Sequence, residues 1–162
     1  MSGYIDVQVN GYYGVDFNSD DLTDDAIVAT CRQLRSDGVD RFLPTIITDD
    51  LSVMTDRVDR LATACESIPE VAASVAGIHI EGPFISPVEG YIGAHPPQHA
   101  CHATVDVAMR FIEAGRGWVR LVTLAPEIDG TAELTRRLVD ESIVVAAGHS
   151  DASLTQHKRA ID

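Results

Sequence analysis

Two side chains that could bind a metal follow apolar runs in this sequence. Glu81 ends the run GIHI and precedes a glycine and a proline, while His149 follows the run IVVAA and Gly148. Side chains at the carboxyl ends of parallel strands meet at one edge of a sheet. A carboxylate oxygen and an imidazole nitrogen together suit a divalent metal such as zinc. The pattern predicts a metal site, with a capping or ion-paired Glu81 and a helix-capping neighbour at His149 as alternatives.

The other histidines favour different roles. His79 shares the strand face of Glu81 two residues earlier, which indicates a core residue or one that orients a ligand. His95 lies in a Gly- and Pro-rich loop, where it could contact a substrate or only solvent. His99, Cys101 and His102 are close in sequence but lack the second ligand pair of a zinc site. A final His-Lys pair, at positions 157 and 158, is expected on a solvated helix face.

The elements that would position these residues alternate regularly. Strands are predicted at residues 4–10, 41–48, 75–80, 118–124 and 143–147. Helices are predicted between them, the first capped by Thr23 and the second by Asp50, with two more at residues 105–113 and 131–140. Ser150 or Asp151 is expected to cap a last helix. Pro44 predicts a bulge or an irregular ladder in the second strand.

This alternation predicts an α/β fold with a parallel sheet. A doubly wound sheet would fit as well, but GYYGVDF after the first strand lacks the spacing of a dinucleotide-binding loop. We therefore favour a partial (β/α)8 barrel with about five strands. A complete barrel needs roughly 250 residues. The single domain at residues 1–162 is accordingly expected to be truncated before the last strands.

Composition excludes several classes of partner. The net charge of −13 argues against nucleic-acid binding, and the apolar runs are too short for a membrane span. Lys158 is the single lysine, a bias that suits concentrated salt or follows from a GC-rich genome. Three scattered cysteines predict no disulfide framework and a reducing cytoplasm.

Five blocks taken in order give a more specific indication. They are IDVQVNGYYGVDFN, RFLPTIIT, GIHIEGPFISPVEGYIGAHP, LVTLAPE and VVAAGHSDAS. Together they resemble N-acetylglucosamine-6-phosphate deacetylase of the amidohydrolase superfamily over essentially the whole chain. The resemblance implies a TIM barrel of the metal-dependent hydrolase type. It also implies hydrolysis of the acetamide of an amino-sugar phosphate, giving glucosamine 6-phosphate and acetate.

The resemblance also assigns roles to individual residues. Glu81 and His149 match metal ligands of the family, and His95, with Gly93 and Ala94, matches a loop that contacts the sugar. The implied cofactor is one divalent metal, with zinc preferred and iron or manganese as alternatives. A small-molecule amino-sugar phosphate is the implied partner.

Three further residues are expected to support this site. His79 is placed behind the ligands. Gln8 and Asn10 fall where many amidohydrolases have a His-x-His pair, and amides are poor ligands, so a single metal is expected. The block that ends at Glu127 is interpreted as shaping the loop after the fourth strand.

Several parts of the family's site have no counterpart in this sequence: the aspartate general base, the second metal histidine and the residues that hold the phosphate. The isolated chain is therefore expected to be inactive, unless self-association through uncovered barrel edges or a second polypeptide completes it. A non-catalytic domain that binds a sugar phosphate or a protein is the alternative. Another alternative is an amidohydrolase that acts on a cyclic amide or an amino-nucleobase.

Overall fold

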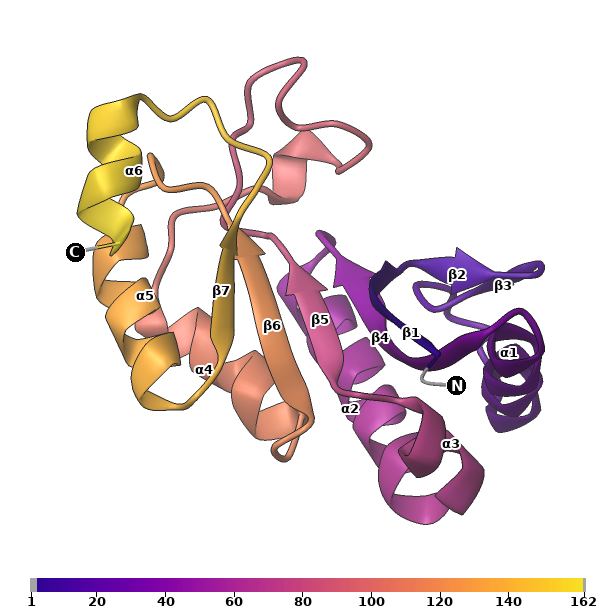
Figure 1. The fold of residues 1–162 in the computed structure, drawn as a ribbon. Coiled ribbons are helices and arrows are strands. Elements are labelled where there is room, and N and C mark those ends of the chain that lie inside the picture. Colours follow the sequence, from indigo (N-terminus) through magenta and orange to yellow (C-terminus); the bar gives the residue numbers. More distant parts are fainter. Residues whose placement is uncertain (1–2, 162) are drawn as a thin grey trace.

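A computed structural model of the chain describes residues 3–161, which form a curled, five-stranded parallel sheet with helices on its outer side (Figure 1). The strands follow one another in space as they do in sequence: β1 (Tyr4–Val9), β4 (Val39–Ile47), β5 (Ile78–Glu81), β6 (Val119–Leu124) and β7 (Val144–Ala147). A doubly wound sheet would reverse its strand order. The unidirectional order and the curl confirm the partial barrel.

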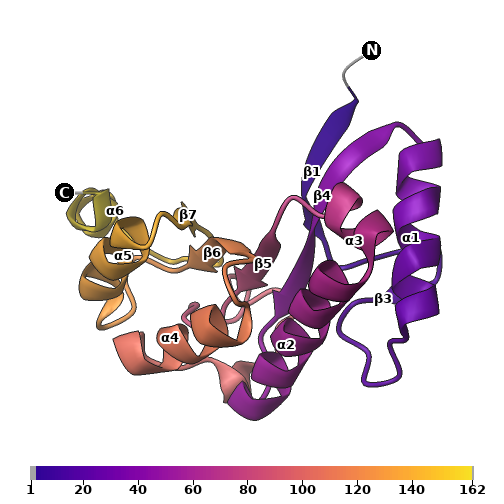
Figure 2. The ribbon, with the colours of Figure 1, turned by 90° about the horizontal axis from the view of Figure 1, so that it is seen from below.

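Helices connect the strands and cover the convex side of the sheet (Figure 2). They are α1 (Asp24–Ser36), α2 (Leu51–Ser67), α3 (Pro69–Ser74), α4 (Val105–Ala114), α5 (Thr131–Asp140) and α6 (Leu154–Ile161), with a 3-10 turn at Pro97–His99. Because all five strands are parallel, their carboxyl ends lie at the same end of the sheet.

The first two helices begin where the sequence predicts. Thr23 accepts a hydrogen bond from the Ala26 amide at 3.2 Å, and Asp50 accepts one from the Ser52 amide at 2.9 Å. These caps satisfy backbone donors that have no partner within the helix. Each helix then buries one apolar stripe against the sheet, formed by Ile27, Cys31 and Leu34 in α1 and by Met54, Val58, Leu61 and Cys65 in α2.

The core lies between these stripes and the outer face of the sheet. Phe17 stacks on Phe42 with ring centroids 5.8 Å apart, and both side chains are buried. Pro44 pairs with Val9 at an irregularity in the β1–β4 ladder, as predicted. The core therefore anchors the carboxyl end of β1 beside that of β4.

Several sequence expectations need correction. The third strand begins at Ile78 rather than at residue 75, because residues 69–74 form the unpredicted short helix α3, with Pro69 in its first turn. A small hairpin of β2 (Gly11–Tyr12) and β3 (Val15–Asp16) was also unpredicted. Helix α6 begins at Leu154, where the Ser153 hydroxyl accepts from the Gln156 amide at 3.4 Å. Neither Ser150 nor Asp151 caps it.

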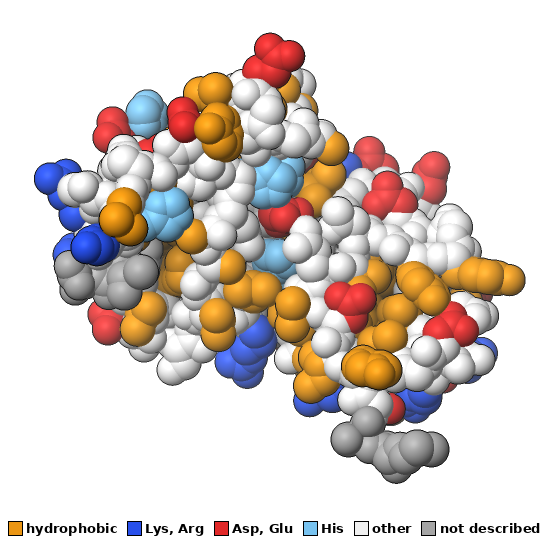
Figure 3. Space-filling model, turned by 45° about the horizontal axis from the view of Figure 1, so that its top comes forward, with side chains coloured by type: hydrophobic (Ala, Val, Ile, Leu, Met, Phe, Trp, Pro, Cys, Tyr) orange, Lys and Arg blue, Asp and Glu red, His pale blue; other side chains and the backbone are white. Residues whose placement is uncertain are grey.

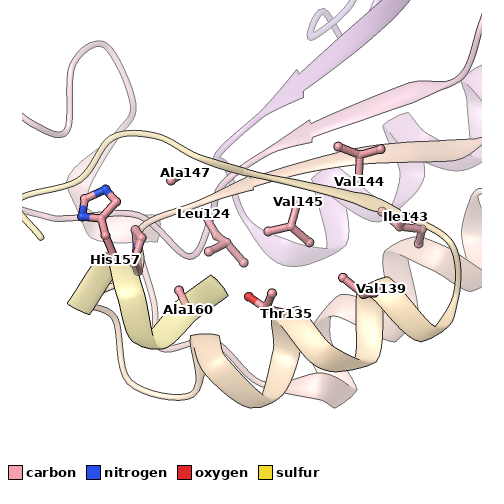
Figure 4. Close-up of a pocket in the computed structure, with 10 residues that line it drawn as sticks. Leu124, Thr135, Val139, Ile143, Val144, Val145, Ala147, His157 and Ala160 are labelled. Atoms are coloured by element: carbon pink, nitrogen blue, oxygen red, sulfur yellow. The ribbon is translucent and has the colours of Figure 1, made fainter. Parts of the chain in front are cut away.

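The outer strands of the sheet leave apolar surface exposed. Tyr4, Ile5 and Val7 on β1 are more than half exposed, and so is Val144 on β7. A cavity of about 390 Å³ lies between β7, α5 and α6, and its lining includes Val145 (Figure 4). No helix among residues 3–161 has the length and apolarity to cross a membrane.

The helix layer should carry much of the stability. Leu61 on α2 is 1% exposed and Leu154 on α6 is 72% exposed. We expect Leu61→Ala to lower the free energy of unfolding by about 2–5 kcal/mol, since it leaves a cavity. The matched Leu154→Ala substitution should change it by less than about 0.5 kcal/mol. Urea unfolding measures both, and equal losses would contradict this packing.

Candidate functional site

Glu81 is the last residue of β5 and points into the open end of the half-barrel. Its side chain is almost fully buried, and it is held in register between Ile47 of β4 and Thr123 of β6. Gly82 follows with φ +85°, and a Cβ there would collide with Thr48. A glycine directly after the strand therefore allows the chain to turn sharply beside Thr48.

His149 approaches the same carboxylate from two residues beyond β7. Its Nε2 lies 3.2 Å from Glu81 Oε1. Its Nδ1 lies 3.1 Å from the carbonyl oxygen of Tyr91. A carbonyl oxygen only accepts hydrogen bonds, so Nδ1 must carry a hydrogen and donate it. In the neutral ring, the lone pair of Nε2 then faces the carboxylate.

That arrangement has a direct electrostatic consequence. Two hydrogen-bond acceptors 3.2 Å apart in this part-buried place repel each other unless a positive group lies between them. Either a proton on Nε2 or a metal cation can supply it. Glu81 and His149 are therefore arranged around a position that favours a cation.

His95 lies on the other side of Glu81, and its hydrogen bonds run the opposite way. Its Nδ1 accepts from the Thr48 amide at 3.3 Å and lies 2.9 Å from the Thr48 hydroxyl. The hydrogen of the neutral ring is therefore on Nε2, which lies 3.7 Å from Glu81 Oε2. Burial, and next the neighbouring His149, lower the pKa of His95, although Glu81 opposes this shift. A neutral His95 presents an N–H donor to the site.

The three side chains together could hold a metal ion. One ligand atom each of Glu81, His95 and His149 lies within 4.8 Å of the others. Figure 3 shows histidine side chains gathered around acidic ones on this face of the molecule. The two imidazoles nevertheless differ in hydrogen-bonding character. In the neutral rings, His149 offers a lone pair to the site and His95 offers a hydrogen.

Gln8 contacts this cluster directly. Its Nε2 donates to Glu81 Oε1 at 2.7 Å. Asn10 lies just past β1 as an exposed residue, and its carbonyl oxygen accepts from the Phe17 amide at 3.0 Å. The sequence predicts that both residues support the site. In the structure, the Gln8 side chain contacts the Glu81 carboxylate, whereas Asn10 bonds to Phe17 through its backbone.

His79 is buried below the cluster. Its Nδ1 lies 3.2 Å from Thr45 Oγ1 on β4, and its Nε2 lies 2.8 Å from Thr123 Oγ1 on β6. Desolvation by burial lowers the pKa of His79, although the charge of Glu81 opposes the shift. The imidazole therefore links three strands directly beneath Glu81.

The loop after β5 folds back over the carboxyl ends of the strands and packs against His149. Gly93 has φ +63°, and a Cβ there would lie 3.2 Å from His149 Cε1, while Ala94 is exposed beside it. The rings of His95 and His149 meet edge to face with centroids 4.4 Å apart. This loop supplies both His95 and the Tyr91 carbonyl that orients His149.

Comparison with known proteins shows which proteins this chain resembles in sequence and in structure. No family model matches the chain. It is 37% identical over 163 residues to the N-acetylglucosamine-6-phosphate deacetylase of Bos taurus, and covers 39% of that protein. It is 36% identical over 162 residues to the N-acetylgalactosamine-6-phosphate deacetylase of Shewanella, again covering 39%. The crystal structure of the Mycobacterium smegmatis N-acetyl-D-glucosamine-6-phosphate deacetylase matches with a TM-score of 0.89 and 31% identity, over 99% of this chain and 40% of that one.

The chain is homologous to part of N-acetylglucosamine-6-phosphate deacetylase. The similarity extends over nearly its whole length and confirms the resemblance found in the five sequence blocks. A variant of the Mycobacterium smegmatis deacetylase has been solved in complex with N-acetyl-D-glucosamine-6-phosphate, so that relative binds an amino-sugar phosphate. The chain spans about two fifths of the length of these deacetylases.

Sequence reasoning missed two groups that shape this candidate site. Thr48, at the end of β4, sets which nitrogen of His95 carries the hydrogen. Asn18 donates to the Thr45 carbonyl and accepts from the Ile47 amide, both at 3.0 Å, so it satisfies the end of β4. Thr48 is a polar residue at the carboxyl end of a strand, which is a signal that could have found it. Asn18 carries no such signal, because the loop after β3 brings it to the end of β4.

The buried His79 predicts a pH dependence in the metal-free chain. Because the folded-state pKa of His79 is below the unfolded value of about 6.5, the unfolded chain binds more protons as the pH falls through that value. Stability should therefore be lost below pH of about 6.5, by at most about 1.4 kcal/mol per pH unit for this group. Urea unfolding at several pH values should show a smaller loss in His79→Asn. Identical losses would contradict a neutral, buried His79.

Proposed function

We propose that this chain forms the metal-binding part of a deacetylase that acts on N-acetylglucosamine 6-phosphate. The observation that carries the proposal is the contact between Glu81 Oε1 and His149 Nε2, which favours a positive group, a proton or a metal ion, between the two atoms. The homology to amino-sugar-phosphate deacetylases supports the substrate class. The products would be glucosamine 6-phosphate and acetate. The three free cysteines support a reducing, cytoplasmic location.

Glu81 and His149 are the proposed protein ligands of one divalent metal. A carboxylate oxygen with an imidazole nitrogen suits zinc, and iron or manganese would also accept this pair. When bound, the metal would polarise the acetamide carbonyl and make hydroxide available near neutral pH. Gln8 donates to Glu81 Oε1 and so orients the carboxylate without competing as a strong ligand.

His95 is proposed to bind the substrate. Its Nε2–H points into the site beside Glu81, where it can donate to an oxygen of the sugar or its acetamide. Burial keeps the ring neutral, so it donates a hydrogen bond without adding a second positive charge beside the metal. Gly93 and Ala94 would place the loop backbone against the same substrate, because the absence of bulky side chains allows a close approach.

Metal binding should depend on Glu81. We expect the metal-free chain to bind one equivalent of zinc in isothermal titration calorimetry, and Glu81→Gln to weaken the Kd by more than about tenfold, since a neutral amide is a poor ligand. Glu89→Gln removes an exposed carboxylate from the loop after β5 and serves as the control. Equal zinc affinities in the two variants would contradict the assignment.

A second comparison separates the two imidazoles. His149→Asn should weaken zinc binding as strongly as Glu81→Gln, because it removes the lone pair that faces the carboxylate. His95→Asn should weaken zinc binding far less, because its Nε2 carries a hydrogen in the neutral ring. The opposite order of affinities would make His95 the ligand.

Acetate release tests the activity itself. Catalytic zinc usually has three protein ligands, and two are assigned among the described residues. The zinc-loaded chain is therefore expected to release no more acetate from N-acetylglucosamine 6-phosphate than Glu81→Gln does. Release that disappears in Glu81→Gln would show that self-association or another group completes the site. Release that persists in Glu81→Gln would overturn the proposal. N-acetylgalactosamine 6-phosphate belongs in the same assay, since relatives of both names match.

A further inference from the structure

The segment that carries His149 has little packing to hold it. Strand β7 lies at the edge of the sheet and pairs with β6 through Ala147. Val144 is 62% exposed, and Ala147 is exposed as well. Residues 148–153 then connect β7 to α6. The orientation of His149 must therefore depend on hydrogen bonds from neighbouring loops.

Two of these bonds fix the segment at and before His149. The Gly148 amide donates to the Leu124 carbonyl at 3.0 Å, and the Ser86 amide donates to the His149 carbonyl at 2.9 Å. These bonds hold the backbone near the site. They do not fix the chain beyond His149, where the segment turns toward α6.

Glu127 supplies the anchor on that side. It lies in the loop after β6, and its Oε2 accepts from the Ser150 hydroxyl at 2.7 Å. Its Oε1 accepts from the Asp151 amide, also at 2.7 Å. The Ser150 oxygen accepts in turn from the Ala152 amide at 3.0 Å. One carboxylate thus holds the two residues that follow His149, through short, charge-assisted bonds.

The backbone of His149 needs such an anchor. Its φ of +49° lies in the left-handed region, which is unfavourable for a residue with a Cβ. Strained conformations of this kind persist only where the surroundings hold them. Relaxation to a negative φ would rotate the imidazole away from the Tyr91 carbonyl and from Glu81.

We propose that Glu127 is a positioning residue that keeps His149 in the orientation required to bind the metal. The inference rests on the proposed metal-binding function, but it concerns a residue that touches neither the metal position nor the His149 ring. Glu127 acts through Ser150 and Asp151. The sequence block that ends at Glu127 was interpreted as shaping the loop after the fourth strand. The carboxylate of Glu127 bonds to residues of the following loop, after β7.

Three variants test this role. Glu127→Ala removes both acceptors. Glu127→Gln can still accept from the Asp151 amide and can donate to the Ser150 oxygen, so it should rescue part of the effect. Glu133→Ala removes an exposed carboxylate in the first turn of α5 and is the matched control. Far-UV circular dichroism and thermal unfolding should show that all three variants fold.

Cobalt(II) binding gives the first readout. We expect Glu127→Ala to weaken the Kd for cobalt by about tenfold or more, as for other residues that orient a metal ligand, and to change the visible spectrum of the bound ion. Glu127→Gln should lie between this variant and the wild type, and Glu133→Ala should match the wild type. Equal affinities and spectra in Glu127→Ala and Glu133→Ala would overturn the inference.

The nitrogen-15 NMR signals of the His149 ring in the metal-free chain give the second readout. One sharp set is expected in the wild type and in Glu133→Ala, and shifted or broadened signals in Glu127→Ala. Unchanged signals in Glu127→Ala would overturn the positioning role. Changed signals in a chain whose wild type binds no cobalt would support positioning while contradicting the proposed metal function, so the two failures are distinguishable.

Discussion

The site depends on one hydrogen bond that lies outside the metal position, from His149 Nδ1 to the carbonyl of Tyr91. Because a carbonyl cannot donate, this bond turns the lone pair of the neutral imidazole toward Glu81. A buried carboxylate and an imidazole lone pair 3.2 Å apart repel each other unless a proton or a metal ion lies between them. The proposed affinity of the site for a metal ion thus depends on a backbone carbonyl that orients the imidazole ring.

The parallel half-barrel supplies this geometry by placing one strand end and two loops at the same end of the sheet. β5 carries Glu81, the long loop after it brings back the Tyr91 carbonyl and His95, and the turn after β7 brings His149 (Figure 1). The two histidines make opposite hydrogen bonds. His149 donates to the carbonyl oxygen of Tyr91 in this loop, whereas His95 accepts from the Thr48 amide at the end of β4. Two chemically identical rings therefore face one carboxylate with opposite hydrogen-bonding character.

Much of the framework was predictable because its causes are local in sequence. Thr23 and Asp50 cap helices through contacts within three residues, and the apolar runs specify buried strands. The placement of Glu81 and His149 was predictable because a polar residue at the carboxyl end of a strand lies at the open edge of the sheet, whereas their role as metal ligands stays a prediction. The cap of α6 was wrong because Ser150 and Asp151 bond to Glu127, a partner 23 and 24 residues away. The tautomer of His95 depends likewise on Thr48, 47 residues earlier, and no local pattern reveals it.

Glu81 and His149, and not His95, are the proposed ligands of the metal ion. Anomalous diffraction at the zinc edge from crystals of the chain grown with zinc would test this assignment most directly. We expect one peak about 2.0–2.2 Å from a Glu81 oxygen and from His149 Nε2, with His95 Nε2 outside coordination distance. A peak bonded to His95, or zinc bound only elsewhere on the chain, would contradict it.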